Sequence, residues 1–430
     1  MRVATRVPVA LPALFSAGYL AAYLLPTLTG RLAADFHLTT TQSGASGSLL
    51  LLGSASAGLL LAARGGTLGT VLGRRRRPIG AIGTARLGLV LVALGFGLVA
   101  ALPGSGSGAD RGGWLTAAAL LGCVLGGVGS GTAVAIAGVR TAGSGDPHRA
   151  SVLGLLTTCG LAATLYVALP RIPGGHHTAF AAVALWALAV LPLTTRLASV
   201  PGNTIPVTVP ARHPAPDSRL PHRIWGGVLT GAMLCWSLAQ NALWGVSDRI
   251  GGERAGLDDA QLGLVFAVAL LAGLIGVVAA AAIGPRLGHA APVGVGTAVI
   301  AGSVLLTATA RGADTFTVGE VLWNAVYPAV LSYLMGLAAS FDARGRWAVL
   351  VGSASSLGTA CGPLAGTTLA AAAGFPGMGA ALAALLLVLA APLALTATRV
   401  HASTTFTLVS LSDTPTPAPE LAPQDTTEAC

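Results

Sequence analysis

Charged residues are scarce in this sequence, and lysine is absent altogether. Only 9% of the 430 residues are charged, 53% are hydrophobic, and the mean hydropathy is +0.76. Because a soluble domain carries about a quarter charged residues, this chain lacks the polar surface that a water-soluble globule needs. Backbone groups inside a bilayer must bond to one another, which restricts spanning structures to helices and closed barrels. The long continuous apolar runs favour helices over the alternating pattern of a barrel.

Patterns for metal or nucleotide binding are also missing. Four of the five cysteines fall inside predicted spans, the fifth ends the chain, and their spacing matches no metal site. The glycine-rich run at 127–131 lacks the lysine that follows a phosphate-binding loop. His176 and His177 are adjacent, but two neighbouring histidines do not make a metal site without further ligands. We therefore expect no cofactor and no metal ion.

Twelve segments are apolar over roughly the 20 residues that a membrane-spanning helix needs. We predict spans at 9–29, 43–63, 79–101, 114–137, 151–170, 178–196, 225–247, 260–283, 291–310, 315–339, 347–372 and 376–398.

Two segments do not fit a span. Residues 199–223 are rich in proline, which cannot continue a helix, and this predicts an extended cytoplasmic linker. Residues 399–430 are rich in threonine and proline and carry acidic residues, which predicts a disordered cytoplasmic tail. The predicted domains are therefore one six-helix bundle at 1–198 and a second at 224–398.

A short motif, LxxxQxG, opens an apolar run in each half of the chain. Its members are Leu38, Gln42 and Gly44 in the first copy and Leu257, Gln261 and Gly263 in the second. Two similar halves are the arrangement of proteins that open a central pathway first to one side and then to the other. The predicted fold class is an all-α polytopic membrane protein, with twelve transmembrane helices in two pseudo-symmetric six-helix bundles.

The arginines indicate the orientation. With both termini in the cytoplasm, 17 arginines fall on cytoplasmic segments and 6 on external ones, as the positive-inside bias requires. The net charge of +9 thus reports membrane topology, and we expect no nucleic-acid partner. The expected location is a bacterial-type inner (cell) membrane.

These features together resemble the major facilitator superfamily, over roughly residues 9–398. Its loop pattern after the second span, G-x-L-x-D-R-x-G-R-R, is matched here by Gly66, Leu68, Gly73, Arg74 and Arg75, with Thr70 and Val71 replacing the Asp and Arg. The resemblance implies a secondary transporter with a gating loop at Gly66, Gly73, Arg74 and Arg75. In the family the loop Asp steadies the outward-facing state, so this chain is expected to hold that state otherwise, or less firmly.

Polar residues within spans mark the candidate site, because each needs a partner or a wet cavity. In the tenth predicted span Glu320, Trp323, Asn324 and Tyr327 share one helical face. Glu320 is the one acidic residue inside any predicted span, and a carboxyl in such surroundings suits proton coupling. The alternative is a structural carboxylate that reaches water near the outer end of the helix or is held in a salt bridge.

The seventh predicted span carries a second stripe. Trp236, Gln240 and Trp244 recur every fourth residue, with Asn241 beside them. We predict that they line a substrate cavity; hydrogen bonding between helices is the alternative.

The first predicted span adds Tyr19 and Tyr23 on a related face. The resemblance implies that the first, fourth, seventh and tenth spans line the central path. An aromatic and mostly apolar lining favours a small amphiphilic organic substrate and export over uptake. A single carboxyl within the spans is too few for a dedicated cation cage, which favours a proton gradient over a sodium gradient as the energy source. A single chain supplies the whole pathway, so we expect a functional monomer in the lipid bilayer.

Three other functions stay open. The first is an uptake permease for a small organic solute, and another is a non-transporting sensor of similar fold. A polytopic membrane enzyme would need clustered acids or histidines at the membrane surface. The nearest such cluster is external and interspersed with arginines, so we predict a solvated loop for its members, Asp248, Glu253, Asp258 and Asp259.

Overall fold

The computed structural model describes residues 7–63, 80–104, 109–197, 222–283, 288, 290–342 and 345–412. Every regular element within these ranges is a helix. The gating-loop residues Gly66, Gly73, Arg74 and Arg75 and most of the Pro-rich linker lie outside the described residues.

The first half of the chain forms seven α-helices and two short 3-10 helices. They are α1 (Ala10–Tyr23), α2 (Leu25–Phe36), α3 (Thr40–Ala63), α4 (Ala81–Ala101), α5 (Ala109–Ala142), α6 (Pro147–Ala168), η2 (Leu169–Arg171), α7 (Gly175–Val190) and η3 (Pro192–Leu197).

A bend of 50° at Leu24 separates α1 from α2, and the two together make the first span. Pro26 lies in the first turn of α2 and has no N–H to give to the carbonyl four residues earlier. The carbonyl of Ala22 therefore lacks a donor four residues on; it accepts one backbone N–H at the end of α1 and keeps a second lone pair for another partner.

The second half forms six helices. They are α8 (Arg223–Trp244), α9 (Ser247–Glu253), α10 (Asp259–Ile283), α11 (Ala290–Thr309), α12 (Ala313–Ser340) and α13 (Arg346–Ser412). Gly374 interrupts α13 with a φ of 68° and a ψ of 170°, in a region open mainly to glycine. The two arms of α13 correspond to the eleventh and twelfth predicted spans, and the second arm runs on to Ser412.

Within the described ranges, nine helices are long and apolar enough to cross a membrane, or ten when the α1–α2 pair counts as one span. The seventh predicted span, α8, is not among them. Its Ser237, Gln240 and Asn241 lower the hydropathy, and Ser237 and Gln240 are fully buried. The most polar span thus turns its polar groups into the protein.

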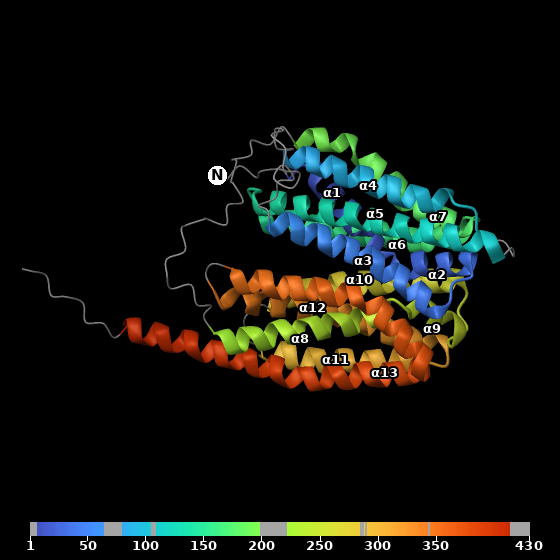
Figure 1. The fold of residues 1–430 in the computed structure, drawn as a ribbon. Helices are drawn as coiled ribbons and strands as arrows, with labels where there is room; N and C mark the ends of the chain where they lie inside the picture. The colour runs from blue at the N-terminus through green and yellow to red at the C-terminus, as the bar shows by residue number, and fades with distance from the viewer. Residues whose placement is uncertain are drawn as a thin grey trace, which may run out of the picture.

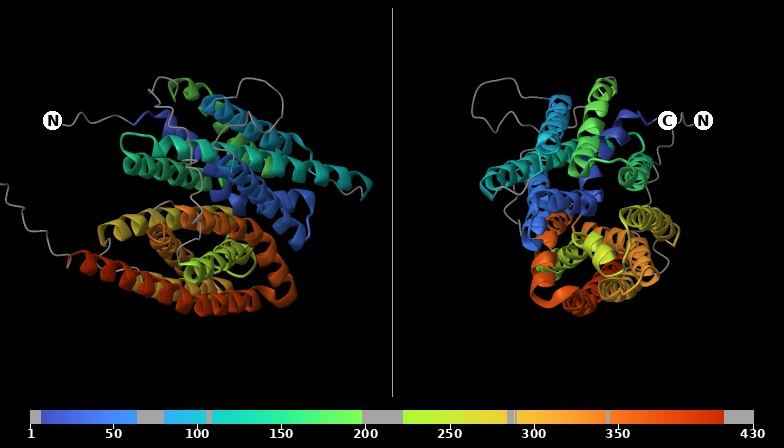
Figure 2. Two further views of the ribbon diagram at one scale, coloured as in Figure 1. Left: turned by 60° about the vertical axis from the view of Figure 1, so that its left-hand side comes forward. Right: turned by 90° about the vertical axis from the view of Figure 1, so that its right-hand side faces the viewer.

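The helices gather into two bundles (Figure 1). One holds α1 to α7 and the other α8 to α13, and the two remain separate layers in both further views (Figure 2). The predicted fold class is confirmed: the chain is a multi-pass membrane protein with two six-helix bundles. The exact domain limits stay a prediction, since the linker lies outside the described residues.

The LxxxQxG repeat begins α3 and α10 in the same way. Gln42 accepts from the N–H of Thr39 (2.9 Å), and Gln261 accepts from that of Asp258 (3.0 Å). In return, the Thr39 side chain accepts from the N–H of Gln42 (3.3 Å), and the Asp258 side chain accepts from the N–H of Gln261 (2.8 Å). This reciprocal pairing is a capping box, which satisfies the first free N–H groups of a helix.

The glycine of each copy lies where the two bundles meet. A Cβ atom built on Gly44 would overlap Thr367 of α13, and one built on Gly263 would overlap the carbonyl of Tyr166 of α6. The repeat therefore combines a helix start with a close crossing between bundles. We call this end of the molecule, which carries the α2–α3 and α9–α10 connections, the contact end.

Candidate functional site

The predicted stripes of α8 and α12 face each other. Trp236 stacks on Tyr327, with ring centroids 5.2 Å apart and planes at 12°. Trp323 lies 5.8 Å from Tyr327 and 5.6 Å from Trp244. Because the stripes recur at helical spacing, two helices in contact bring all four rings together. We call Trp236, Trp244, Trp323 and Tyr327 the aromatic cluster.

Two hydrogen-bond donors, one in this cluster and one beside it, are unsatisfied. Gln240 is fully buried and its Oε1 accepts from Trp323 Nε1. Neither Gln240 Nε2 nor Trp236 Nε1 has a partner among the described residues. A buried donor without an acceptor costs about 1–3 kcal/mol, and these two lie one turn apart on α8. Together they offer a place for an acceptor group of a ligand.

The two asparagines are engaged elsewhere. Asn241 Nδ2 donates to the carbonyl of Ser237 (2.9 Å) and to Thr359 Oγ1 on α13 (3.2 Å). Asn324 Nδ2 donates to the carbonyl of Glu320 in its own helix (3.0 Å). The helix-to-helix bond of Asn241 is the alternative considered from sequence.

Glu320 is fully buried between α12 and the start of α9. Its Oε1 accepts a hydrogen bond from Ser247 Oγ at 2.7 Å, whereas Oε2 has no partner among the described residues. A carboxylate that reached water at the membrane interface would be exposed, so that alternative does not fit. The carboxyl instead has one oxygen bound and one open.

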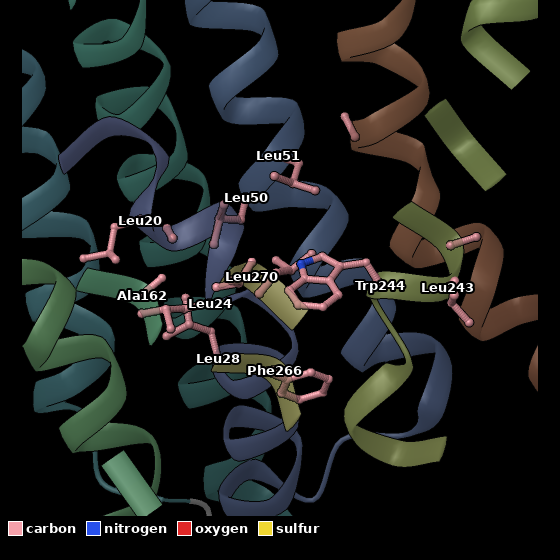
Figure 3. Close-up of a cluster of buried hydrophobic side chains, with 14 of the residues drawn as sticks. Leu20, Leu24, Leu28, Leu50, Leu51, Ala162, Leu243, Trp244, Phe266 and Leu270 are labelled. Carbon is pink, nitrogen blue, oxygen red and sulfur yellow. The ribbon is translucent and has the colours of Figure 1, made fainter. Parts of the chain in front are cut away.

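The first half of the chain meets this site through one main-chain carbonyl, that of Ala22, while a second carbonyl, that of Tyr23, is bound within the first bundle. Trp244 Nε1 donates to the carbonyl of Ala22 (3.2 Å), and Tyr166 OH donates to that of Tyr23 (2.7 Å). Figure 3 shows Trp244 and Phe266 lying beside leucines of the other bundle. Phe266 packs on both Tyr166 (5.1 Å) and Trp244 (5.4 Å), which makes a continuous aromatic contact between bundles.

Tyr19 and Tyr23 also approach the cluster. Both are half-buried on α1, and each interacts electrostatically with Tyr327 of α12. The structure thus brings seven predicted substrate residues from both bundles into one region, namely Tyr19, Tyr23, Trp236, Gln240, Trp244, Trp323 and Tyr327.

The sequence analysis missed Asp248. The prediction of a solvated loop is wrong for this residue, because α9 follows α8 directly and carries Asp248 into the seam between bundles. Its Oδ2 lies against Gly30 of α2, so closely that a Cβ on Gly30 would overlap it. Glu253 does meet solvent, in an exposed ion pair with Arg249 at 2.8 Å. No spacing rule separates these two acids, since the distinction depends on the other half of the chain.

The surroundings of Asp248 favour its neutral form. Burial raises the pKa of this carboxyl from 3.8 to about 7, although the N–H and the charge of Arg249 oppose the shift. Asp248 lies outside the helices that are long and apolar enough to span a membrane.

No protein-family model and no curated protein matches the sequence. Solved structures do match it. A D-xylose–proton symporter is 16% identical, with a TM-score of 0.69 over 90% of this chain and 95% of that one. The human organic anion transporter MFSD10 is 19% identical, with a TM-score of 0.58 over 89% and 97%.

A bacterial homologue of the human lysosomal transporter Spinster is 13% identical, with a TM-score of 0.60 over 95% of this chain and 98% of that one. At such identities the likeness describes the fold. Two pairs of helices join the bundles at the contact end, namely α3 with α13 and α6 with α10. The chain therefore has the fold of the major facilitator superfamily.

Proposed function

We propose that this protein is a secondary transporter that carries a small amphiphilic organic molecule by alternating access of its two bundles. The observation that carries this proposal is the pair of unsatisfied donors, Trp236 Nε1 and Gln240 Nε2, within an aromatic cluster next to the seam. The similar structures named above are those of transporters.

The aromatic cluster suggests the chemistry of the substrate. Stacked rings favour a flat or apolar body, and two neighbouring donors favour an oxygen or nitrogen acceptor on it. Among the described residues next to these rings, the amides of Asn241 and Asn324 are already bonded, which favours drugs or secondary metabolites over sugars.

Glu320 is the group that would couple transport to protons. A neutral carboxyl can remain in a dry site at much lower cost than an ionised one. Uptake of a proton would therefore accompany its burial against Ser247, and contact with water in another conformation would release the proton. Proton-driven export is the direction we propose, with uptake of an organic solute as the alternative.

Vesicles containing the purified protein test both parts. An imposed pH gradient should drive movement of a fluorescent amphiphilic cation in the native protein and fail to do so in Glu320→Gln. Asp314→Asn is the matched control, because Asp314 is an exposed carboxyl on the same helix. Unchanged pH dependence in Glu320→Gln would rule out the proton assignment, and the sign of the gradient that drives movement distinguishes export from uptake.

A further inference from the structure

The seam between the bundles contains a carboxyl with no cation opposite it. Asp248 Oδ2 packs on Gly30, and a side chain at position 30 would collide with it. The carboxyl thus lies against the main chain of α2, in the other bundle, and Asp248 is half-buried there.

The charged groups around this carboxyl are committed to other partners. On α9, Arg249 binds Glu253 through Nε (3.0 Å) and Nη2 (2.8 Å). On α2, Arg31 donates to the carbonyl of Gly175 (3.1 Å) and to Thr178 (3.0 Å).

Three further titratable groups, Asp259, Tyr166 and Glu320, lie near the seam. Arg31 also interacts electrostatically with Asp259 of α10. Tyr166 of α6 interacts with both Asp248 and Glu320. The negative charge of Glu253 also acts on Asp248, and α11, which packs against α9, contains no ionisable residue. No cation of α2, α6, α10 or α11 among the described residues binds the Asp248 carboxyl.

We propose that Asp248 is a second protonation site, at which a bound proton allows α2 and α9 to close and from which proton loss drives them apart. The role of this switch in transport rests on the proposed function, but the opening and closing of α2 against α9 can be measured without a substrate. Ser247, which precedes Asp248, donates a hydrogen bond to Glu320. The first turn of α9 therefore carries the carboxyl of Asp248 and binds that of Glu320.

The direction of the pH effect follows from linkage. In the closed seam the pKa of Asp248 is about 7, and in an open, hydrated seam it returns towards 3.8. Closing therefore takes up a proton between these pH values, and acid favours the closed form. The closing equilibrium should change by up to about tenfold per pH unit within this window and level off above it.

Spin labels can measure the seam directly. We would place nitroxides at Ala34 on α2 and Gly252 on α9, both exposed, with the five native cysteines replaced. Distances measured by pulsed electron resonance in lipid vesicles, without substrate, should shift from a short to a longer population as the pH rises from 4.5 to 8.5.

Three variants sharpen the test. Asp248→Asn should stay closed at every pH, and Glu320→Gln should keep the shift. Gly30→Ala should open the seam at every pH, whereas Gly160→Ala, with open space around it, should behave like the native protein. A native pH shift that persists in Asp248→Asn, or no shift in the native protein, would overturn the inference. A normal seam response without any solute movement would overturn the proposed transport function instead.

Discussion

Asp35 and Asp248 are both carboxyls of the contact end, but they have opposite surroundings. Asp35 Oδ2 accepts from His176 Nδ1 (2.6 Å) and from the N–H of the same residue (2.7 Å). His176 Nε2 faces the carbonyl of Leu102 at 3.1 Å, so one imidazole joins α2, α4 and α7. Asp248 instead faces a glycine of the other bundle. A carboxyl paired within its bundle holds that bundle together, whereas one facing across the seam makes closure depend on its charge.

The two bundles also differ in what they contribute to the candidate site. The second half supplies the side chains that can bind or titrate, including Gln240, Glu320 and all four rings of the aromatic cluster on α8 and α12. The first half contributes two tyrosines, Tyr19 and Tyr23, and one main-chain carbonyl, that of Ala22. Substitutions in the two halves should therefore have different consequences.

The largest effect is expected where the bundles cross. Gly263→Val would force a branched side chain against the Tyr166 carbonyl, and overpacking of this kind costs about 1–3 kcal/mol. The cost falls on the closed contact end, so transport in vesicles should be lost while the protein still purifies as a folded species. Gly58→Val is the control, because Gly58 has open space around it. Equal transport by Gly263→Val and Gly58→Val would show that the close contact of Gly263 with Tyr166 is not needed for transport.

The paired carboxyl should matter for stability more than the unpaired one. His176→Ala removes the ring that binds Asp35 and Leu102, and leaving a buried acceptor without its donor costs about 2 kcal/mol. Thermal unfolding in detergent should show a lower midpoint for this variant. Asp248→Asn, which breaks no pair across the seam, should unfold at or above the native midpoint. The comparison fails if Asp248→Asn is the less stable of the two.

The smallest effect is expected at a single donor of the site. Trp236→Phe keeps a ring to stack on Tyr327 and removes the unsatisfied Nε1 donor. The loss of one hydrogen bond is worth about 1 kcal/mol, so KM for a substrate with an acceptor group should rise roughly fivefold to tenfold with little change in the maximal rate. A substrate analogue without the acceptor should not distinguish the two proteins. Equal KM values for both substrates would remove Trp236 from the site.

Much of the fold was predictable because lipid imposes length and apolarity on every span. The twelve predicted spans correspond to helices, and the two copies of LxxxQxG begin equivalent helices with the same capping box. The aromatic stripes were also visible, since helical spacing alone decides that Trp236 and Gln240 share a face.

The remaining features depend on partners that are distant in sequence. His176 lies in a short external connection by sequence, yet it is fully buried because Asp35 and the Leu102 carbonyl supply acceptors. Asp248 and Glu253 differ in role only through the position of Gly30. Asn241 and Gln240 are adjacent, but their directions around α8 send one to α13 and the other to the cluster.

The bend at Leu24 gives the first bundle its means of holding the second. A straight helix through this point would use the oxygens of Ala22 and Tyr23 for its own turns. Because Pro26 cannot donate, the Ala22 oxygen accepts from the indole of Trp244 in the second bundle. The Tyr23 oxygen accepts from the phenol of Tyr166 on α6 of its own bundle. Recognition by an oxygen atom of the peptide chain does not depend on which side chain sits at position 22, so this position can change identity while the bundles continue to dock in the same register.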